Sequence, residues 1–493
     1  MSDQPLSENE RAGIEKWVKR HPKTVAALCF LLLVVLALYA LNAKAERGLA
    51  RRIAAIKAKG EPTTVNDLVA LRSRLPDDQN MITQLLERSG TVANLTVPDD
   101  KRALIPLEGT AISVPTGRVW PHKQLEASQW YLRQVADDLR RVHDALRLER
   151  GILNVDLQDS SYPLGTKSTV LLPLLTKIRG VLRVLGLEAG VAAEMGDQAR
   201  AGLILNEMSH VRAWSGSEAP LITALTEMAS NVFIEDRIER TVNRCGLPAD
   251  TLRQLQRSVH TLEASPDLKG VFLVERVFFL DYVAYLRSGK ASPSLFAPPG
   301  TNPSVVWRHL PAVSAWDAAL GLDAQSQIVD AIDGPTGTTL AGVQALAASP
   351  ALNAWYAVYS RILLPSQLRA VFLWVRAVGQ TRAMEAALAC ELYRLENGRW
   401  PAKLGELVPT LLERVPTDPV DGKAIRYAEI PEGIKTWTII DDYGKRDDGG
   451  DVRRLEPYDA NIRPKDYGWV ILNPELRGRP ATTQEATSGP ARP

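Results

Sequence analysis

The spacing of apolar residues predicts α-helices along most of the chain. In residues 125–151 the apolar positions recur three and four residues apart, at Leu132, Val135, Leu139, Val142 and Leu146. This spacing places one apolar stripe on a helix, and the stripe packs against a neighbouring helix. Between 171 and 265 similar patterns are broken at 196–197 and at 246–248, where glycine and proline end helices. The pattern there predicts two pairs of antiparallel helices.

One of these pairs resembles the helical hairpin of tetratricopeptide repeats. The resemblance rests on the stretch AEMGDQARA, residues 193–201, and on small residues that let two helices approach closely: Ala189, Gly190, Ala193, Gly196, Ala199 and Ala201. No regular period of 34 residues, which such repeats require, persists along the chain. We therefore predict an irregular, tetratricopeptide-like layer of helical hairpins in the middle of the chain.

A continuous apolar run occupies residues 24–43, with no charge between Lys23 and Lys44. Twenty helical residues, at a rise of about 1.5 Å each, span about 30 Å, which is the thickness of the hydrocarbon core of a bilayer. A cleaved signal peptide has a shorter apolar core and a small-residue cleavage site, and the following ALNAKAERG is a weak match to one. The run therefore predicts an uncleaved transmembrane anchor.

The charges on the two sides of this run leave its orientation open. Five basic residues precede it, Arg11, Lys16, Lys19, Arg20 and Lys23, and five follow it, Lys44, Arg47, Arg51, Arg52 and Lys57. The side with more basic residues stays in the cytoplasm, so equal counts do not decide the orientation.

Composition and motifs argue against nucleic-acid binding and give no sign of an enzyme. The 493 residues include 59 basic and 57 acidic side chains, and this near-balance removes the electrostatic argument for nucleic-acid binding, which needs clustered positive charge along the phosphate backbone. The sequence has no H-E-x-x-H, no G-x-S-x-G and no phosphate-binding loop. Polar residues within the apolar segment from Gly270, namely Glu275, Arg276 and Asp281, are interpreted as an internal ion pair or an exposed face rather than a polar pocket. His143, beside the apolar stripe, is interpreted as a packed or solvated residue rather than a ligand.

The pattern changes near the C-terminus. A long helix from Pro365 is predicted to end at Asn397-Gly398, and Trp400-Pro401 forms a turn. Leucines at 404, 407, 411 and 412 predict a short amphipathic helix. Three runs rich in β-branched and aromatic residues, 423–430, 434–441 and 467–472, predict a small antiparallel sheet.

This C-terminal part resembles the major pseudopilin of type II secretion. The matching residues are Tyr393, Arg394, Leu395, Asn397, Gly398, Trp400 and Pro401 at the helix end, Pro416, Asp418, Pro419 and Gly422 in the turn, and Asp447, Asp448, Gly449 and Gly450 in an acidic loop. The chain departs from that family at its start, because it lacks the cleaved leader and the motif that follows it. Residues 44–364 also separate the apolar run from the matching part.

The resemblance implies a calcium site in the acidic loop, with Asp447, Asp448 and Asp451 as its ligands. Calcium takes six to eight oxygens, which carboxylates and backbone carbonyls of a flexible loop can supply. The spacing is not that of an EF-hand. A solvated acidic turn, neutralised by Lys445 and Arg446, is the alternative interpretation.

The patterns together divide the chain into eight parts. These are a basic segment (1–23), the anchor (24–43), a stalk with short helices (44–120), the helical-hairpin domain (121–288), a linker rich in Pro, Gly and Ser (289–304), a helical segment (305–364), a long helix with a pseudopilin-like α+β module (365–473) and a disordered tail (474–493). The predicted fold is mainly α.

The whole chain resembles large single-anchor helical membrane proteins of planctomycete-type bacteria, which implies a location rather than an activity. We predict a single-pass protein of the cytoplasmic membrane whose bulk lies in the periplasm or outside the cell. Its predicted partners are the lipid bilayer and a protein of the envelope, with no nucleic acid. The predicted function is a non-enzymatic scaffold or protein-interaction module related to secretion or pilin-like systems. A membrane-anchored hydrolase or ligand sensor, with a site assembled from distant residues, is the alternative.

Overall fold

A computed structural model describes most of the chain. The described residues are 16–71, 74–92, 95–109, 111, 114–154, 168–211, 214–216, 219–263, 266–288, 311–333, 336–439, 449–450, 452 and 466–479. The chain forms two compact units. Unit 1 comprises Met1–Glu61, Tyr282–Asp323 and Pro350–Ile362, and unit 2 comprises Pro62–Asp281, Ala324–Ser349 and Leu363–Pro493.

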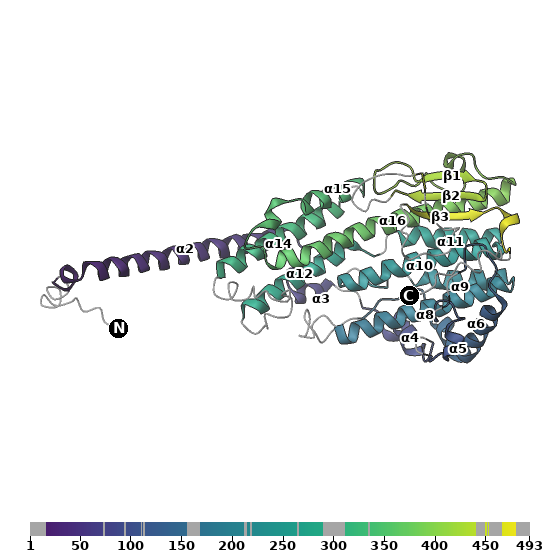
Figure 1. Cartoon of the computed structure of the whole chain (residues 1–493), viewed down its shortest axis with the longest axis horizontal. Helices are drawn as coiled ribbons and strands as arrows, with labels where there is room; N and C mark the ends of the chain where they lie inside the picture. The colour runs from purple at the N-terminus through teal and green to yellow at the C-terminus, as the bar shows by residue number, and fades with distance from the viewer. Residues whose placement is uncertain are drawn as a thin grey trace. The chain divides into compact units, whose positions relative to one another are not determined.

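The described residues form a mainly helical structure with one small sheet, which confirms the predicted class (Figure 1). The α-helices are α2 (Pro22–Ala58), α3 (Val65–Leu71), α4 (Met81–Arg88), α5 (Asp99–Arg102), α6 (His122–Gln134), α7 (Ala136–Ala145), α8 (Ser168–Glu194), α9 (Gln198–His210), α10 (Leu221–Cys245), α11 (Ala249–Leu262), α12 (Leu268–Arg287), α14 (Pro311–Ile332), α15 (Thr336–Ala347) and α16 (Tyr359–Asn397). Short 3₁₀ helices are η1 (Asp77–Gln79), η3 (Pro350–Asn353), η4 (Leu404–Leu407) and η5 (Pro474–Leu476).

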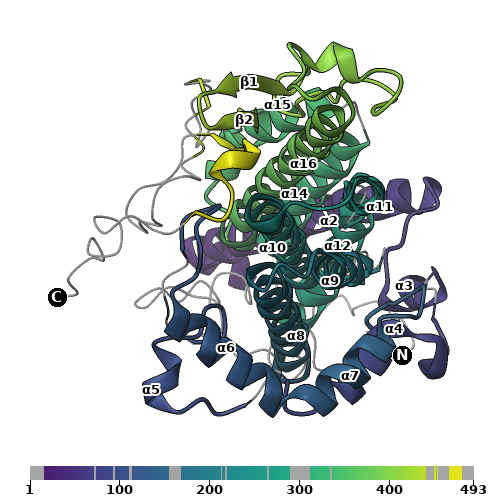
Figure 2. The ribbon, with the colours of Figure 1, turned by 90° about the vertical axis from the view of Figure 1, so that its right-hand side faces the viewer.

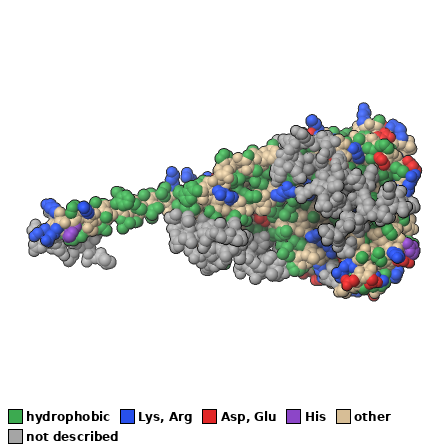
Figure 3. Space-filling model, viewed as in Figure 1, with side chains coloured by type: hydrophobic (Ala, Val, Ile, Leu, Met, Phe, Trp, Pro, Cys, Tyr) green, Lys and Arg blue, Asp and Glu red, His purple; other side chains and the backbone are tan. Residues whose placement is uncertain are grey.

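Helix α2 has two different halves within unit 1. Residues 26–41 are exposed on every side, and Figure 3 shows apolar side chains along this part of the helix. The second half packs, because Ala45, Leu49 and Ile56 are buried. Arg52 adds a two-pronged ion pair to Asp323 of α14, with both N–O distances 2.7 Å. The helix is long and apolar enough to cross a membrane.

Asp317 of α14 holds the start of α16 in unit 1. Its buried carboxylate accepts hydrogen bonds from the backbone N–H groups of Val358 at 2.9 Å, Tyr359 at 2.7 Å and Ser360 at 3.1 Å. The first N–H groups of a helix have no partner within the helix, and an acidic side chain satisfies them. This capping extends α16 upstream of the predicted start at Pro365.

The four helices predicted between residues 171 and 265 are present in unit 2, and of the two predicted hairpins α8 and α9 pack against each other. Helix α8 ends before Gly196, whose φ is +75°, and Asp197 begins α9 by accepting a hydrogen bond from the N–H of Arg200 at 2.9 Å. Helix α10 ends at Gly246, whose φ is +67°, and α11 follows at Ala249. Helix α8 packs along both α9 and α10, and α9 packs along α11 (Figure 2). Both predicted helix breaks are therefore confirmed.

The helix predicted over 125–151 is two helices. Helices α6 and α7 meet at Val135, whose φ of −104° and ψ of 9° lie outside the α-helical range. Val135 is itself buried, as are Leu139, Val142 and Leu146. Four of the five stripe residues are thus buried as predicted and Leu132 is partly buried, although the backbone that carries them bends.

The sheet contains β1 (Arg426–Ile430), β2 (Gly433–Thr438) and β3 (Tyr467–Leu472), antiparallel and in that order. Trp437 of β2 lies opposite Gly468 of β3, and a Cβ on Gly468 would come within 2.7 Å of Trp437. Strands β1 and β3 fall within the predicted runs, and β2 begins one residue before its run, at Gly433. The predicted amphipathic helix over Leu404–Leu412 is only the 3₁₀ helix η4.

The chain after β3 remains packed further than its polar composition predicts. Arg477 forms two hydrogen bonds to the buried carboxylate of Glu391 in α16, at 2.7 and 2.9 Å. Arg479 accepts a backbone hydrogen bond from Val119 at 3.0 Å. Disorder was expected from Pro474, whereas Pro474–Arg479 is held by these contacts. The rest of the predicted tail lies outside the described residues.

Candidate functional site

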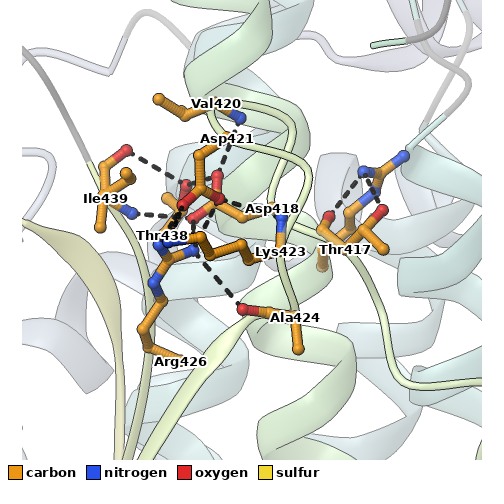
Figure 4. A network of polar contacts seen from close by, with 10 residues as sticks. Thr417, Asp418, Val420, Asp421, Lys423, Ala424, Arg426, Thr438 and Ile439 are labelled. Atoms are coloured by element: carbon orange, nitrogen blue, oxygen red, sulfur yellow. Dashed lines mark hydrogen bonds and ion pairs between the residues drawn. The ribbon is translucent and has the colours of Figure 1, made fainter. Parts of the chain in front are cut away.

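A buried aspartate organises the turn that precedes the sheet. Asp418 is fully buried, and its Oδ1 accepts hydrogen bonds from the N–H of Val420 and the hydroxyl of Thr438, both at 2.9 Å (Figure 4). Its Oδ2 accepts from the N–H of Ile439 and from Arg426, also at 2.9 Å. One carboxylate therefore joins the turn to the beginning of β1 and the end of β2.

Two carboxylates of this turn share one guanidinium group, that of Arg426. Arg426 also donates to Asp421, at 2.6 and 3.1 Å, and this contact holds the pKa of Asp421 below its usual value despite partial burial. Burial raises the pKa of Asp418, and its hydrogen bonds offset that only in part. Four donors occupy the two oxygens of Asp418, so the residue is a structural clamp rather than a ligand for an added ion.

The predicted calcium ligands Asp447, Asp448 and Asp451 lie outside the described residues. The described edge of their loop is Gly449 and Gly450, whose carbonyls accept hydrogen bonds from the ammonium of Lys435 at 2.6 and 3.1 Å. That ammonium also lies over the ring of Trp437, 5.0 Å from its centre. A cation of the protein itself therefore contacts the backbone oxygens at this edge of the acidic loop.

The sheet is attached to two long helices by side chains that bond to its backbone. Asn243 of α10 donates to the carbonyl of Val470 at 2.6 Å and accepts from the N–H of Leu472 at 2.7 Å. Glu239 accepts from the N–H of Val470 at 2.9 Å. These residues satisfy the outer edge of β3, which would otherwise be open to pairing with another strand. On the other side, the indole of Trp469 donates to the carbonyl of Gln380 in α16 at 2.8 Å.

His143 lies between two carboxylates on the helical layer. Its Nδ1 is 2.6 Å from Glu207 and its Nε2 is 2.9 Å from Glu188. Burial disfavours the imidazolium, but the hydrogen bonds to the two carboxylates outweigh it and raise the pKa of His143 to about 9. Arg200 also contacts Glu188. A nitrogen of Arg200 also lies 2.9 Å from Nε2 of His143. His143 is packed, which is one of the two interpretations from the sequence, and it belongs to a network of charged side chains.

A second buried carboxyl group lies where α10 and α16 pack. Glu235 is completely buried and accepts a hydrogen bond from the hydroxyl of Thr381, while its other oxygen has no partner among the described residues. Burial raises its pKa to about 8, against the hydrogen bond from Thr381. This carboxyl group is therefore neutral through most of the physiological pH range.

The polar residues of the apolar helix α12 have a structural explanation. Glu275 accepts a hydrogen bond at 2.9 Å from the N–H of Leu221, the first residue of α10. Arg276 is buried, and Asp281 is exposed. Glu275 thus caps a neighbouring helix, a role outside the ion pair or exposed face that we predicted from the sequence.

One group of described residues has the composition of a metal site. The ligand atoms of His260, Glu263 and Glu385 lie within 4.8 Å of one another. The Oε1 of Glu263 already accepts two hydrogen bonds from Arg382, at 3.0 and 2.6 Å. A guanidinium so close neutralises the carboxylate and competes with a cation. We therefore treat the group as an ion-pair network.

A small cavity in unit 2 was not predicted from the sequence. It has a volume of about 40 Å³ and lies between α8, α10 and the segment 106–120. Its charged lining residues are Arg118, Glu194, Arg237, Arg240 and Arg244. They come from three separate stretches, so no local motif indicates them.

Comparison of the chain with protein-family models, with curated proteins and with solved structures finds no match. The function is therefore argued from the arrangement of the residues.

Proposed function

We propose that this chain is a single-pass membrane protein of the cell envelope that acts as a non-enzymatic scaffold or protein-interaction module. The observation that carries the proposal is the apolar half of α2, which is exposed on all sides in unit 1. A helix that is hydrophobic all round is stable only inside a protein core or a membrane. Its most apolar window has none of its residues buried within the protein, which leaves the membrane.

The packing of α2 favours a retained anchor over a cleaved signal sequence. The helix continues without a break from the apolar run to Ala58, and its second half is packed through Leu49 and Ile56. Arg52 adds its ion pair to Asp323. Cleavage after the apolar run would cut a helix whose remaining half has buried residues and an ion pair within unit 1.

The C-terminal part supports a relation to secretion or pilin-like systems. A long helix, a turn at Trp400-Pro401 and a three-stranded antiparallel sheet follow one another in the order expected of a pseudopilin. The turn residues that carry the resemblance include Asp418, which clamps the two ends of that turn. We infer that this module docks a partner protein of the envelope, while the helical hairpins give it a broad support.

We infer further that the bulk of the chain lies on the outer face of the cytoplasmic membrane, because the pseudopilin resemblance implies it. A cysteine introduced as Ser488→Cys, treated in intact cells with a thiol reagent that cannot cross the membrane, tests this orientation. Labelling of intact cells supports it, with the unsubstituted chain as the control for Cys29, Cys245 and Cys390. Labelling only after lysis reverses the orientation.

The interaction itself is tested by crosslinking in native membranes, followed by detergent extraction and capture of the full-length chain. We expect a defined envelope partner, lost when the C-terminal turn is disrupted by Asp418→Ala. Retention of the same partner by that variant, provided that it is still folded, would contradict docking through the C-terminal module.

A ligand sensor is the second candidate, and the arginine-lined cavity is the observation that favours it. A cavity with convergent polar groups is the usual form of a small-molecule site. The chemistry of that cavity leads to a separate inference, which holds whether or not the scaffold proposal is correct.

A further inference from the structure

The cavity is walled by segments that are held in place by their own contacts. The carbonyl of Gly117 accepts a hydrogen bond from the N–H of Gly478 at 2.9 Å, and the N–H of Val119 donates to Arg479 at 3.0 Å. On the opposite wall, a Cβ added to Gly190 of α8 would come within 2.8 Å of the Trp120 ring. The residue at this position must therefore be glycine for the indole to lie where it does. The cavity is preformed.

Positive charge dominates the lining. Arg118, Arg237, Arg240 and Arg244 contribute four guanidinium groups, and Glu194 contributes one carboxylate. Glu194 pairs with Arg244 at 2.7 Å. Asp236, outside the lining, accepts from Arg240 at 3.1 Å and also contacts Arg237. These six groups have a formal charge of +2, from four arginines against two carboxylates.

Two further lining residues are buried hydrogen-bond donors. The hydroxyl of Thr116 and the amide nitrogen of Gln124 have no partner among the described residues, although the side chains are only 5% and 6% exposed. A buried donor without a partner costs about 1–3 kcal/mol. Both donors border the same cavity as the arginines, so an acceptor placed there would satisfy them.

The size of the cavity limits what that acceptor can be. A volume of about 10–15 Å³, measured in the same way, holds one water molecule, so about 40 Å³ holds about three. A compact group with several oxygens fits this space, and a large organic ligand does not. Arginine is the side chain best suited to bind such a group, because its donors form a planar fork that matches phosphate and carboxylate oxygens.

We propose that this cavity binds a phosphate group. A phosphate carries a charge of about −1.5 to −2 at neutral pH, and the lining holds four guanidinium groups and one carboxylate. Its oxygens can accept hydrogen bonds from several sides, and the lining offers guanidinium, hydroxyl and amide donors from separate parts of the chain. A carboxylate has one charge and two oxygens in a plane, and so would leave donors unpaired. The group is either free inorganic phosphate or the end of a phosphomonoester.

The experiment is isothermal titration of the detergent-purified full-length chain at constant ionic strength, with chloride as the balancing anion. Inorganic phosphate, glycerol 2-phosphate and acetate are the three probes. We expect phosphate to bind and acetate to bind at least about tenfold more weakly, since tenfold corresponds to one charge-assisted hydrogen bond. Binding of glycerol 2-phosphate identifies a phosphomonoester as an acceptable ligand, and its failure to bind identifies free phosphate.

The variants separate the site from general surface charge. Arg240→Gln is expected to weaken phosphate binding at least about tenfold. Arg179→Gln removes an exposed arginine of α8 outside the cavity and is expected to leave binding unchanged. Thr116→Val keeps all charges and removes one unpaired donor, so it is expected to weaken binding several-fold even if Arg240→Gln does not fold.

Several results would overturn the proposal. These are no binding of phosphate by the unsubstituted chain, binding of acetate as tight as that of phosphate, and equal loss of binding in Arg179→Gln and Arg240→Gln. Unchanged binding by a folded Thr116→Val would likewise place the phosphate outside this cavity.

Discussion

Two long apolar helices, α2 and α16, have similar lengths of 37 and 39 residues but different surroundings. The most apolar window of α2 has a mean hydropathy of 2.8, and none of it is buried in the protein. The corresponding window of α16 has a mean hydropathy of 1.2, with 39% of its residues buried. Length and apolar content suit both for a bilayer, so the distinction lies in what each helix contacts.

The contacts of α16 are those of a core helix. Met384, Ala387 and Leu388 are fully buried in the main hydrophobic core, and charged residues interrupt the apolar positions. Those charges have partners within unit 2, as Arg382 has in Glu263 and Glu391 has in Arg477. Residues 26–41 of α2 are all exposed and carry no charge. Helix α16 is therefore surrounded by other parts of the protein, and we propose that the exposed apolar part of α2 is surrounded by lipid.

The largest expected effect is on the anchor. Replacing Leu32 and Leu36 by arginine is expected to cost about 2.5–3.5 kcal/mol for each residue at mid-span, and so about 5–7 kcal/mol in total. The double variant should fail to stay in membranes after a carbonate wash, whereas the unsubstituted chain should remain. A double variant that still sediments with washed membranes would show that α2 is not the anchor or that a second segment anchors the chain.

The core helix should respond to mutation in the opposite way. Leu388→Ala removes a fully buried side chain from α16 and is expected to reduce the free energy of unfolding by about 3–5 kcal/mol. Leu395→Ala, on the same helix at 43% exposure, is expected to stay within about 0.5 kcal/mol. Thermal melting of the detergent-extracted protein measures both. Loss of membrane attachment in Leu388→Ala without loss of stability would make α16 a second anchor.

The apolar helix over residues 24–43, the helix breaks and the strands were predictable because each depends on local signals. An uninterrupted apolar run, a glycine with positive φ at Gly196 or Gly246, and alternating β-branched residues all act over a few positions. The bend at Val135 and the early start of α16 were not predictable in this way. The start depends on Asp317, which is distant in sequence and caps the helix from α14.

The turn before the sheet should be the next most sensitive feature. Asp418→Asn replaces one acceptor oxygen by a donor amide and removes the charge that pairs with Arg426, which is expected to cost about 3 kcal/mol. Asp421→Asn should cost less, because Asp421 is less buried and Arg426 keeps its contact with Asp418. Equal melting of the two variants would show that Asp418 is not the clamp.

The pH dependence of stability tests His143. Its pKa is about 9 in the folded chain and about 6.5 when unfolded, so its stabilising contribution is complete below pH 6.5 and is lost as the pH rises to 9. We expect about 2 kcal/mol to be lost across this window, less than the full shift implies, because neighbouring charges readjust. His143→Gln should flatten the melting profile between pH 6.5 and 9, and exposed His210→Gln should not.

Glu235 also makes the folded chain less stable as the pH rises, over a pH range that overlaps that of His143. A variant of Glu235 therefore serves as a control for His143. The pKa of Glu235 is about 8 in the folded chain and 4.5 in the unfolded chain. Between these pH values the carboxyl group ionises in the unfolded chain but stays neutral in the folded chain, so the free energy of unfolding falls as the pH rises from 4.5 to 8. Glu235→Gln should remove that slope and leave the slope due to His143. If His143→Gln also abolishes the slope below pH 6, our assignment of the two groups is wrong.

The candidate sites were less predictable than the fold for a reason that these residues illustrate. His143 meets its carboxylates through α8 and α9, and the arginines of the cavity come from the segment 106–120 and from α10. Such groups come together only after the helices pack, and their positions in the sequence follow no regular spacing from which the site could be predicted. The acidic loop differs from these sites, because its carboxylates are close in sequence and could be recognised from the sequence alone.

The smallest expected effect concerns that loop, at the end of the chain that carries α16. If Asp447, Asp448 and Asp451 bind calcium, an ion concentration of ten times the dissociation constant stabilises the folded chain by about 1.4 kcal/mol. Weak sites of this type have dissociation constants of about 0.1–1 mM, so millimolar calcium is the test, with magnesium and a chelator as comparisons. Magnesium should do less, because it demands tighter octahedral geometry. Membrane attachment through α2 should not change with any of the three.

A variant of Lys435 adds a second test of the calcium site, because the ammonium of Lys435 donates hydrogen bonds to the carbonyl oxygens of Gly449 and Gly450. A calcium ion that uses those oxygens must displace it, so Lys435→Met is expected to increase the stabilisation by calcium, whereas Asp448→Ala is expected to abolish it. If calcium uses only the carboxylates, Lys435→Met leaves its effect unchanged. Identical melting in calcium, magnesium and chelator, for the unsubstituted chain and both variants, would make the loop a solvated turn. The cation that contacts Gly449 and Gly450 in this loop would then be the ammonium of Lys435 rather than calcium.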